Sequence, residues 1–352
     1  MDNITEYKCP ACGGAMEFDS QSQKMKCPYC DSIMDLEEFE RRQKELEGEF
    51  VSECHGWLPG EKEGMRIYVC KSCGGEIVAD ESTGATSCPF CGNKVTMKAQ
   101  FEGDLRPDYV IPFKLDKKAA KQAYLNHLKG KKFLPKCFKE QNHIEEIKGL
   151  YVPFWVYDVD TYANVNYKAE KVRVWRNGDT EYTETKFYDI VRAGNMSFDH
   201  IPVDSSRKMD DVLMESIEPF DFHDAVEFKA AYLAGFLADR FDVAAEDKEA
   251  RVENRVANSA KIAFRNTIHG YDSVVPRHCN AHLETMKCWY TLYPVWILNT
   301  KWNGKNFVFA MNGQTGKMVG DLPADSKMFW MTLLGLGSVL SAILIFVTYW
   351  FF

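Results

Sequence analysis

A chain of 352 residues has room for several domains, because one domain usually takes roughly 100–200 residues. Charged residues make up 27% of the chain and aromatic residues 13%, which fits folded globular material with an additional apolar segment. The opening residues, MDNITEYKCP, lack the basic-then-apolar pattern of a secretory signal peptide, so we expect no such segment.

The net charge of −8 is unevenly distributed along the chain. Residues 1–103 contain 11 Lys and Arg against 19 Asp and Glu, whereas the remainder contains 32 of each. Binding to nucleic-acid phosphates requires clustered cations. The acidic N-terminal region therefore favours a protein partner or a structural role and makes nucleic acid unlikely as its partner.

One cysteine pattern occurs twice in this acidic region, at an offset of 61 positions. Each copy reads C-x2-C, a gap of 14 residues, and C-x2-C again. Tyrosine, glycine, aspartate and proline residues recur in register with the cysteines, which indicates duplication of one structural unit. The first module (residues 1–34) and the second module (66–100) supply eight candidate ligands: Cys9, Cys12, Cys27 and Cys30, then Cys70, Cys73, Cys88 and Cys91.

This spacing predicts two structural zinc ribbons of small β type. Two thiolates separated by two residues reach one ion from a tight turn, and two such turns complete a tetrahedral shell suited to Zn²⁺. A unit of this size buries too little apolar surface to fold without the metal. The alternatives are disulfides, which need an oxidising compartment, and a redox pair, which needs a thioredoxin-like setting; neither context is visible.

Residues 35–65 are predicted to form a connector, with a helical spacer over 35–47 supported by charge pairs four residues apart. A loop follows that contains Cys54 and His55. We interpret these two as loop residues and not as ligands of a third metal, because each ribbon already has four sulfurs.

Residues 101–327 predict an α+β domain with an antiparallel sheet. A short strand is expected at 109–113 and a helix at 117–129, which Asp116 caps and Gly130 ends. Long strands are expected at 150–175 and 180–193 on either side of the Asn177-Gly178 turn.

The second half of this domain alternates between helices and strands. A short helix is expected at 211–216 and a long one at 244–268, whose apolar face carries Val252, Val256, Ile262 and Phe264. Apolar strands then flank turns at Asn303-Gly304 and at 313–316.

Residues 328–352 contain no charged residue across 25 positions and predict one transmembrane helix. Such a helix is about 37 Å long, against a hydrocarbon core of about 30 Å. Aromatic residues at both ends match the interface belts of membrane proteins. We expect a single-pass, tail-anchored protein of the cell membrane whose bulk lies in the cytoplasm, where thiols stay reduced.

No enzymatic motif is recognisable, and we expect no catalysis. The GxxGK at 313–317 has the wrong spacing for a phosphate-binding loop and is interpreted as a hairpin turn. His278, Cys279, His282 and Cys288 could form a further metal site or serve a membrane hydrolase, but their spacing matches no standard pattern.

Taken together, the segments resemble a bacterial family of membrane-anchored TFIIB-type zinc-ribbon proteins. The resemblance covers most of the chain and rests on both cysteine modules, the terminal span and four later motifs: IPFKLDKKAA (111–120), GLYVPFW (149–155), LYPVW (292–296) and FAMNGQTGKMVGDLP (309–323). Some members carry a name borrowed from the primosomal helicase PriA on ribbon similarity alone. The resemblance implies partners among flotillin-like (SPFH) proteins and phage-shock-protein-A-like envelope stress proteins.

These features predict a non-enzymatic adaptor or scaffold that recruits protein partners at the cytoplasmic face of the membrane. Exposed turns of the ribbons or an aromatic sheet edge would supply the binding surface. The alternative is a membrane-tethered nucleic-acid-binding protein or transcription regulator that uses the ribbons, which their similarity supports and the charge distribution opposes.

Overall fold

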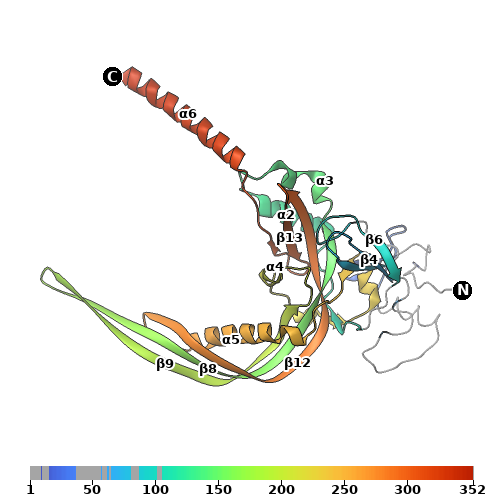
Figure 1. Cartoon of the computed structure of the whole chain (residues 1–352), viewed down its shortest axis with the longest axis horizontal. Helices are drawn as coiled ribbons and strands as arrows, with labels where there is room; N and C mark the ends of the chain where they lie inside the picture. Colours follow the sequence, from blue (N-terminus) through green and yellow to red (C-terminus); the bar gives the residue numbers. More distant parts are fainter. Residues whose placement is uncertain are drawn as a thin grey trace.

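Figure 1 shows the computed structural model of the chain, which describes residues 9, 16–36, 57, 62, 65–80, 87–100 and 105–351. The protein is a multi-domain α+β structure with antiparallel sheets and one C-terminal apolar helix. The predicted spacer beyond Leu36, together with Cys54 and His55, lies outside the described residues.

Two sheets contain the strands of the described residues. The first module forms a three-stranded sheet of β1 (Glu17–Asp19), β2 (Lys24–Lys26) and β3 (Ile33–Met34). The second module contributes to an 11-stranded sheet, in which the main path runs β10-β7-β12-β8-β11-β5-β4-β6. Its strands are β4 (Met65–Val69), β5 (Glu76–Asp80), β6 (Thr96–Gln100), β7 (Tyr109–Val110), β8 (Lys148–Asn177), β9 (Thr180–Asp204), β10 (Val226–Glu227), β11 (Leu237–Asp239), β12 (Ser273–Trp302), β13 (Lys305–Asn312) and β14 (Met318–Val319).

The helices accompany this sheet in chain order. They are α2 (Lys117–Leu128), η1 (Lys136–Lys139), α3 (Gln141–Ile144), α4 (Asp211–Ser216), η2 (Phe222–Asp224), η3 (Ala230–Leu233), η4 (Glu246–Lys248), α5 (Glu249–Arg265) and α6 (Ser326–Phe351). The predicted cap of α2 is confirmed, because the Asp116 carboxylate accepts a hydrogen bond from the amide of Ala119. The short helix over 211–216 and the turn at Asn303-Gly304 are also confirmed, whereas the other two-residue turn lies one position later than predicted, at Gly178-Asp179.

The long helix differs from its prediction. Helix α5 begins at Glu249 instead of 244, after the short 3-10 turn η4. Val252 and Val256 are buried as expected, and Ala260 completes the buried stripe. Ile262 is 65% exposed, so its place on the apolar face was wrong: the stripe follows the i, i+4, i+8 spacing and Ile262 lies two positions off it.

The central strand β8 passes through three environments. Residues 149–157 are buried on both faces, as their unbroken apolar sequence requires, and they contact the main core. Residues 159–169 alternate between buried and exposed, with one face under α5. Residues 171–177 are exposed on both faces. One strand therefore begins in the body of the protein and ends far outside it.

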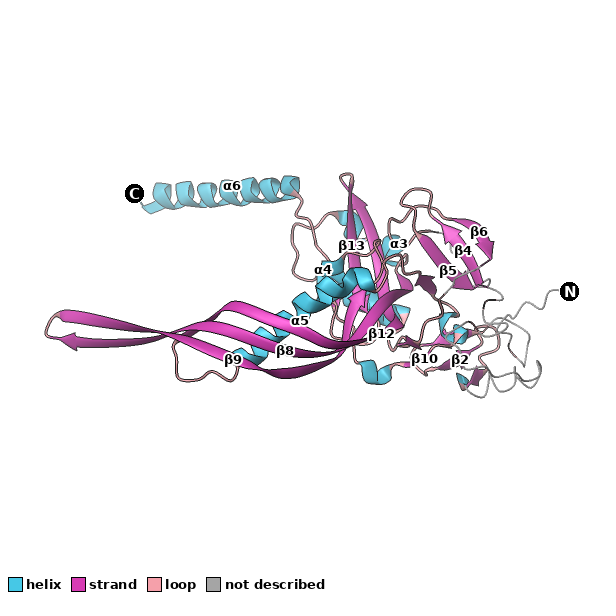
Figure 2. Cartoon of the chain, turned by 60° about the horizontal axis from the view of Figure 1, so that its bottom comes forward, coloured by secondary structure: helices cyan, strands magenta, loops and turns pink. Residues whose placement is uncertain are grey.

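The projecting part is a curved arm of β9, β8 and β12, with α5 along one face (Figures 1 and 2). Its outer strands carry extra residues where their pairing with β8 shifts register. In β12 the shifts fall between Pro276 and His278 and between Leu283 and Thr285. In β9 the shift falls opposite the segment of β8 that follows Tyr157. In β9 the shift coincides with a positive φ of 57° at His200. Bulges of this kind bend a strand, which explains the curvature of the arm.

Helix α6 leaves the body as a separate element (Figure 1). The most apolar 18-residue window of this helix has a mean hydropathy of 2.2, and none of the residues Ser326–Trp350 is buried in the protein. By length and composition this helix is able to cross a membrane. Its first turn is attached to the body, because the Asp325 amide donates to the Phe133 carbonyl at 2.7 Å and the rings of Phe133 and Phe329 meet edge to face at 5.3 Å.

Gly149 in β8 tests the packing of the main core. A β-carbon there would lie 2.5 Å from the Phe236 ring and 3.3 Å from the Phe113 ring, which stack on each other at 4.2 Å. We expect Gly149→Ala to lower the free energy of unfolding by about 1–3 kcal/mol, because the stacked rings must move. Chemical denaturation measures the change. Gly194→Ala in β9 is the matched control, since its nearest neighbour would be at 3.9 Å, and an equal loss in both variants would contradict the prediction.

Candidate metal centres

The second module brings all four of its cysteines together. The Sγ atoms of Cys70, Cys73, Cys88 and Cys91 lie within 4.8 Å of one another, with 3.5 Å between Cys70 and Cys91 and 3.6 Å between Cys73 and Cys88. A tetrahedral ion with metal–sulfur bonds of about 2.3 Å separates its ligands by about 3.8 Å, whereas a disulfide requires about 2.05 Å. The cluster therefore has the dimensions of a metal site and not of two disulfides.

Two matching backbone turns position these sulfurs. The Gly74 amide donates to the Cys70 carbonyl at 2.8 Å, and the Gly92 amide donates to the Cys88 carbonyl at 2.9 Å. Both glycines have positive φ, 71° and 72°, in the region that L side chains rarely occupy. Glycine adopts this conformation without strain, which allows each C-x2-C turn to reverse the chain directly after its second cysteine.

The first module builds the same turn with a different residue. Asp31 has a φ of 57° where Gly92 stands in the second copy, and its amide donates to the Cys27 carbonyl at 3.0 Å. Aspartate tolerates this conformation better than most residues. The sulfurs of Cys9, Cys27 and Cys30 lie within 4.8 Å of one another. Cys12, the predicted fourth ligand, lies outside the described residues.

The chemistry of these groups fits a thiophilic divalent cation. Burial would raise the pKa of the Cys70 thiol, but the amides of Cys73 and Ser72 and neighbouring thiols lower it to about 7, near the range where the metal-binding thiolate forms. Burial raises the pKa of the Cys88 thiol instead, so a cation would be needed to hold it as a thiolate. The Asn93 side-chain amide donates to the Cys91 sulfur at 3.5 Å and orients it.

The body of the protein holds the second centre by its turns. Lys208 donates to the Cys73 carbonyl at 2.8 Å and Lys148 donates to the Ser87 carbonyl at 2.6 Å. Asn299 of β12 donates to the Pro89 carbonyl. No sequence pattern marked these anchoring side chains, because they lie at least 61 positions along the chain from the turn residues that they contact. The expectation of exposed ribbon turns therefore fails here for Pro89 and Phe90, which are buried, and holds for Lys71, Ser72 and Gly74, which are exposed.

Equivalent residues of the two copies have opposite environments. Phe90 is 9% exposed, and its ring fills the space where a β-carbon on Gly75 would lie, 2.7 Å away. Tyr29, at the same position in the first copy, is 75% exposed. The duplicated turn is thus part of the core in the second module and part of the surface in the first.

The first module rests against the body through its strands. The Phe18 amide donates to the Ala234 carbonyl at 3.3 Å, and the Phe18 ring meets Tyr232 edge to face at 5.0 Å. The Gln23 side chain donates to the Phe113 carbonyl at 2.5 Å. These contacts leave the Tyr29 turn free of the body.

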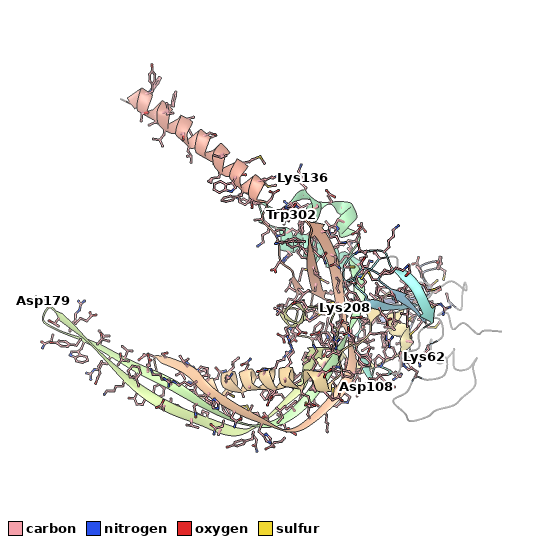
Figure 3. The ribbon with its side chains drawn as sticks, viewed as in Figure 1. Lys62, Asp108, Lys136, Asp179, Lys208 and Trp302 are labelled. Atoms are coloured by element: carbon pink, nitrogen blue, oxygen red, sulfur yellow. The ribbon has the colours of Figure 1, made fainter. Side chains whose placement is uncertain are left out.

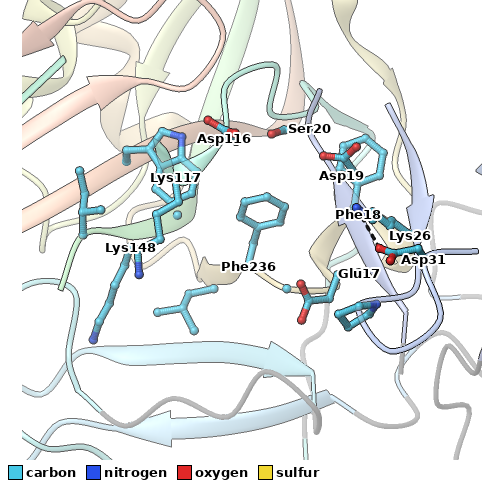
Figure 4. A pocket seen from close by; sticks show the side chains of 16 residues that line it. Glu17, Phe18, Asp19, Ser20, Lys26, Asp31, Asp116, Lys117, Lys148 and Phe236 are labelled. Carbon is cyan, nitrogen blue, oxygen red and sulfur yellow. Dashed lines mark ion pairs between the residues drawn. The ribbon is translucent and has the colours of Figure 1, made fainter. Parts of the chain in front are cut away.

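A cavity of about 700 Å³ separates the first module from the main sheet (Figure 4). Glu17, Asp19 and Asp31 of the first module face Lys117 and Lys148 of the body across it, with Phe236 between them. No cysteine or histidine is among the described residues that line it.

The further metal site that the sequence left open does not form among the described residues. His278, Cys279, His282 and Cys288 all lie in β12, where Cys279 pairs with Val165 and Cys288 with Tyr157. An extended strand separates these two cysteines by about 30 Å. The sequence did not predict a strand over residues 273–286, because this polar stretch does not have the apolar composition of the residues that follow.

Strand β11 connects the second module to the rest of the sheet. It runs parallel to β8 at Leu237 and Ala238 and antiparallel to β5 over residues 237–239. Arg240 extends the connection with a salt bridge to Glu76 of β5 at 3.1 Å. Asp239 within this strand is buried, and its Oδ2 has no hydrogen-bond partner among the described residues.

With this geometry established, comparison with known proteins gives one clear relative. The chain is 31% identical over 305 residues to the uncharacterized protein YdjG of Bacillus subtilis, a match that covers 73% of this chain and 89% of the relative. The chain belongs to the same family as YdjG. No family model matches the chain, and no solved structure matches it.

Removal of one sulfur tests the second centre. We expect the purified chain to carry about two thiophilic metal ions and the Cys73→Ser variant to carry about one, since a structural site needs all four sulfurs. Elemental analysis of the gel-filtered protein measures the content. Cys137→Ser is the control, because Cys137 is a free thiol outside both clusters, and equal metal loss in both variants would argue against the site.

Asp239 makes stability depend on pH. Burial raises the pKa of Asp239 from 3.8 to about 7, so between these values the folded chain holds a proton that the unfolded chain has released. Stability is therefore expected to fall as the pH rises from about 4 to about 7 and then to level off. Asp239→Asn, which stays neutral, should be more stable than the parent at pH 8 and gain little at pH 4. Thermal unfolding across this range measures the difference. A pH-independent gain, or the same profile for the exposed control Asp179→Asn, would contradict it.

Proposed function

We propose that this protein is a non-enzymatic, membrane-anchored adaptor that presents a zinc-ribbon surface to protein partners. The observation that carries the proposal is the geometry of the second cluster, in which four sulfurs at tetrahedral spacing leave no position open for a substrate. A metal held in this way stabilises a shape and does not perform chemistry.

Zinc is the ion that this donor set favours. Four cysteine sulfurs in C-x2-C pairs suit a tetrahedral ion without redox chemistry, and the first cluster repeats the arrangement with three described sulfurs. The same reduced thiols favour the cytoplasm as the location of the soluble part, with α6 as the anchor in the cell membrane.

The first module is the better candidate for the recruiting surface. Its turn over residues 28–31 is exposed, and Tyr29 presents an aromatic ring with a polar end, a side chain that is enriched in protein interfaces. The corresponding turn of the second module is covered by the body and has the role of a rigid base.

The resemblance to the TFIIB-type zinc-ribbon family directs the choice of partners. It implies flotillin-like (SPFH) proteins and phage-shock-protein-A-like envelope stress proteins at the cytoplasmic face. We propose one of these as the occupant of the Tyr29 surface, since the acidic N-terminal region favours protein over nucleic acid.

Substitution of Tyr29 tests this function. We expect Tyr29→Lys to reduce co-purification of the phage-shock-protein-A-like or flotillin-like partner from native membranes by at least about tenfold, because a central aromatic contact often contributes 2 kcal/mol or more. Quantitative mass spectrometry of the tagged full chain measures the recovery. Met97→Lys, at an apolar position that is 63% exposed on the second module, is the matched control.

Two results would contradict the adaptor. One is unchanged recovery of both candidate partners with Tyr29→Lys. The other is unchanged recovery after a chelator has removed the metal, which would show that the shape of the ribbons is irrelevant to recruitment.

A further inference from the structure

The outer end of the arm is a bare two-stranded hairpin, here called the arm tip and defined as residues 171–187. Strand β12 stops pairing with β8 at the contact of Ser273 with Glu170. Beyond it, β8 and β9 continue as a pair to the Gly178-Asp179 turn, the end marked by Asp179 in Figure 3. An isolated two-stranded hairpin is only marginally stable in water. Contact with another surface would therefore stabilise the arm tip.

The arm tip exposes more apolar and aromatic surface than a solvated hairpin would. Five large side chains are between 41% and 60% exposed: Val172, Val174, Trp175, Tyr182 and Phe187. Directly paired residues share a face, so Val172, Val174 and Phe187 lie on one face of the hairpin, while Trp175 and Tyr182 stack at 5.6 Å on the other. Contiguous apolar surface of this kind marks a binding region.

The polar residues of the arm tip suit a boundary between water and lipid. Four Lys and Arg and three Asp and Glu occupy residues 171–187, a net charge of +1 in a chain of net charge −8. Two of the cations pair with neighbouring acids, Arg176 with Glu181 at 2.9 Å and Lys186 with Glu184 at 3.5 Å. Arg173 lies over the Trp175 ring at 5.6 Å. Tryptophan and tyrosine beside cations are typical of the interfacial layer of membranes.

The arm tip projects from the body towards the membrane that α6 would cross. Figures 1 and 2 both show the arm and α6 leaving the body on the same side. The arm spans 20 residues from Tyr157 to Asn177, about 65 Å of extended chain. The contacts of Asp325 and Phe329 with Phe133 fix the root of α6 on the body, so the two projections have a defined relation.

We propose that the arm tip lies in the interfacial layer of the same bilayer that α6 crosses, so that the protein contacts the membrane at two separate points. This inference rests on the proposed membrane anchor. Its ligand is the phospholipid–water interface: the hairpin lies along it, with the stacked Trp175 and Tyr182 turned towards the upper acyl region and the polar turn with Asp179 among the headgroups. The cavity-side face of the body and the first module stay in water, and the arm sets the tilt of the body over the membrane.

Tryptophan fluorescence tests the position of the arm tip in the full chain. The protein is reconstituted into phosphatidylcholine vesicles, with and without phospholipids brominated near the headgroup end of the acyl chain, which quench only tryptophans in contact with them. The chain has 8 tryptophans, so each contribution is the difference between parent and variant. We expect Trp175→Phe to remove a share of the quenched emission similar to that removed by Trp330→Phe in α6.

The controls separate this inference from the anchor itself. Trp289→Phe, at the root of the arm where its ring lies 6.4 Å from that of His200, should leave the quenched share unchanged. If Trp330→Phe lowers the quenched share and Trp175→Phe does not, the arm tip is away from the lipid and the inference is overturned while the anchor stands. If the Trp175 emission is not quenched and one arm tip cross-links to another, the exposed apolar surface of the arm tip binds a second copy of the chain, and the inference is overturned. If Trp330→Phe also has no effect, α6 is not in the bilayer and both proposals fail.

Discussion

The structure depends on the need of β8 for hydrogen-bonded neighbours along its full length. Its residues 149–157 are apolar and buried, so each backbone amide and carbonyl there must find a partner inside the protein. Strand β12 supplies them on one edge, and the short β11 followed by β9 supplies them on the other. Because β11 also pairs with β5, the second cysteine module is held in the same sheet as the core.

This connection explains why two copies of one motif have diverged in their surroundings. The second copy lies where side chains from β8 and β12 reach its turn carbonyls, and Phe90 has become a core residue. The first copy meets the body through β1 and the loop that follows, which leaves Tyr29 in solvent. A rigid copy beside an accessible copy is an arrangement suited to presenting a binding surface at a fixed position.

The same strand also determines the reach of the molecule. Once β8 leaves the body, one face is covered by α5, and Tyr167 donates to the Lys261 carbonyl at 2.6 Å to hold the helix on the arm. Beyond Ser273, where β12 begins, neither face of the β8–β9 pair is covered. Bulges in the outer strands bend the arm, so its end and α6 leave the body on one side. An anchor at one point leaves a body free to rotate, whereas a second contact would restrict its orientation.

The sequence alone determined the elements that depend on local chemistry. Cysteine spacing identified the two clusters, Asp116 and Gly130 bounded a helix, Asn177-Gly178 located the turn of the longest hairpin to within one residue, and an uncharged stretch of 25 residues identified α6. Each of these follows from contacts within a few residues or from composition. Tertiary structure decided the rest: Ile262 faces solvent, Cys279 and Cys288 lie far apart on one strand, and Phe90 is buried where Tyr29 is exposed. Those outcomes depend on which distant strand lies beside each of these residues. The sequence does not indicate that β11 pairs with β5, because β11 has only three residues, too few to show a periodic hydrophobic pattern.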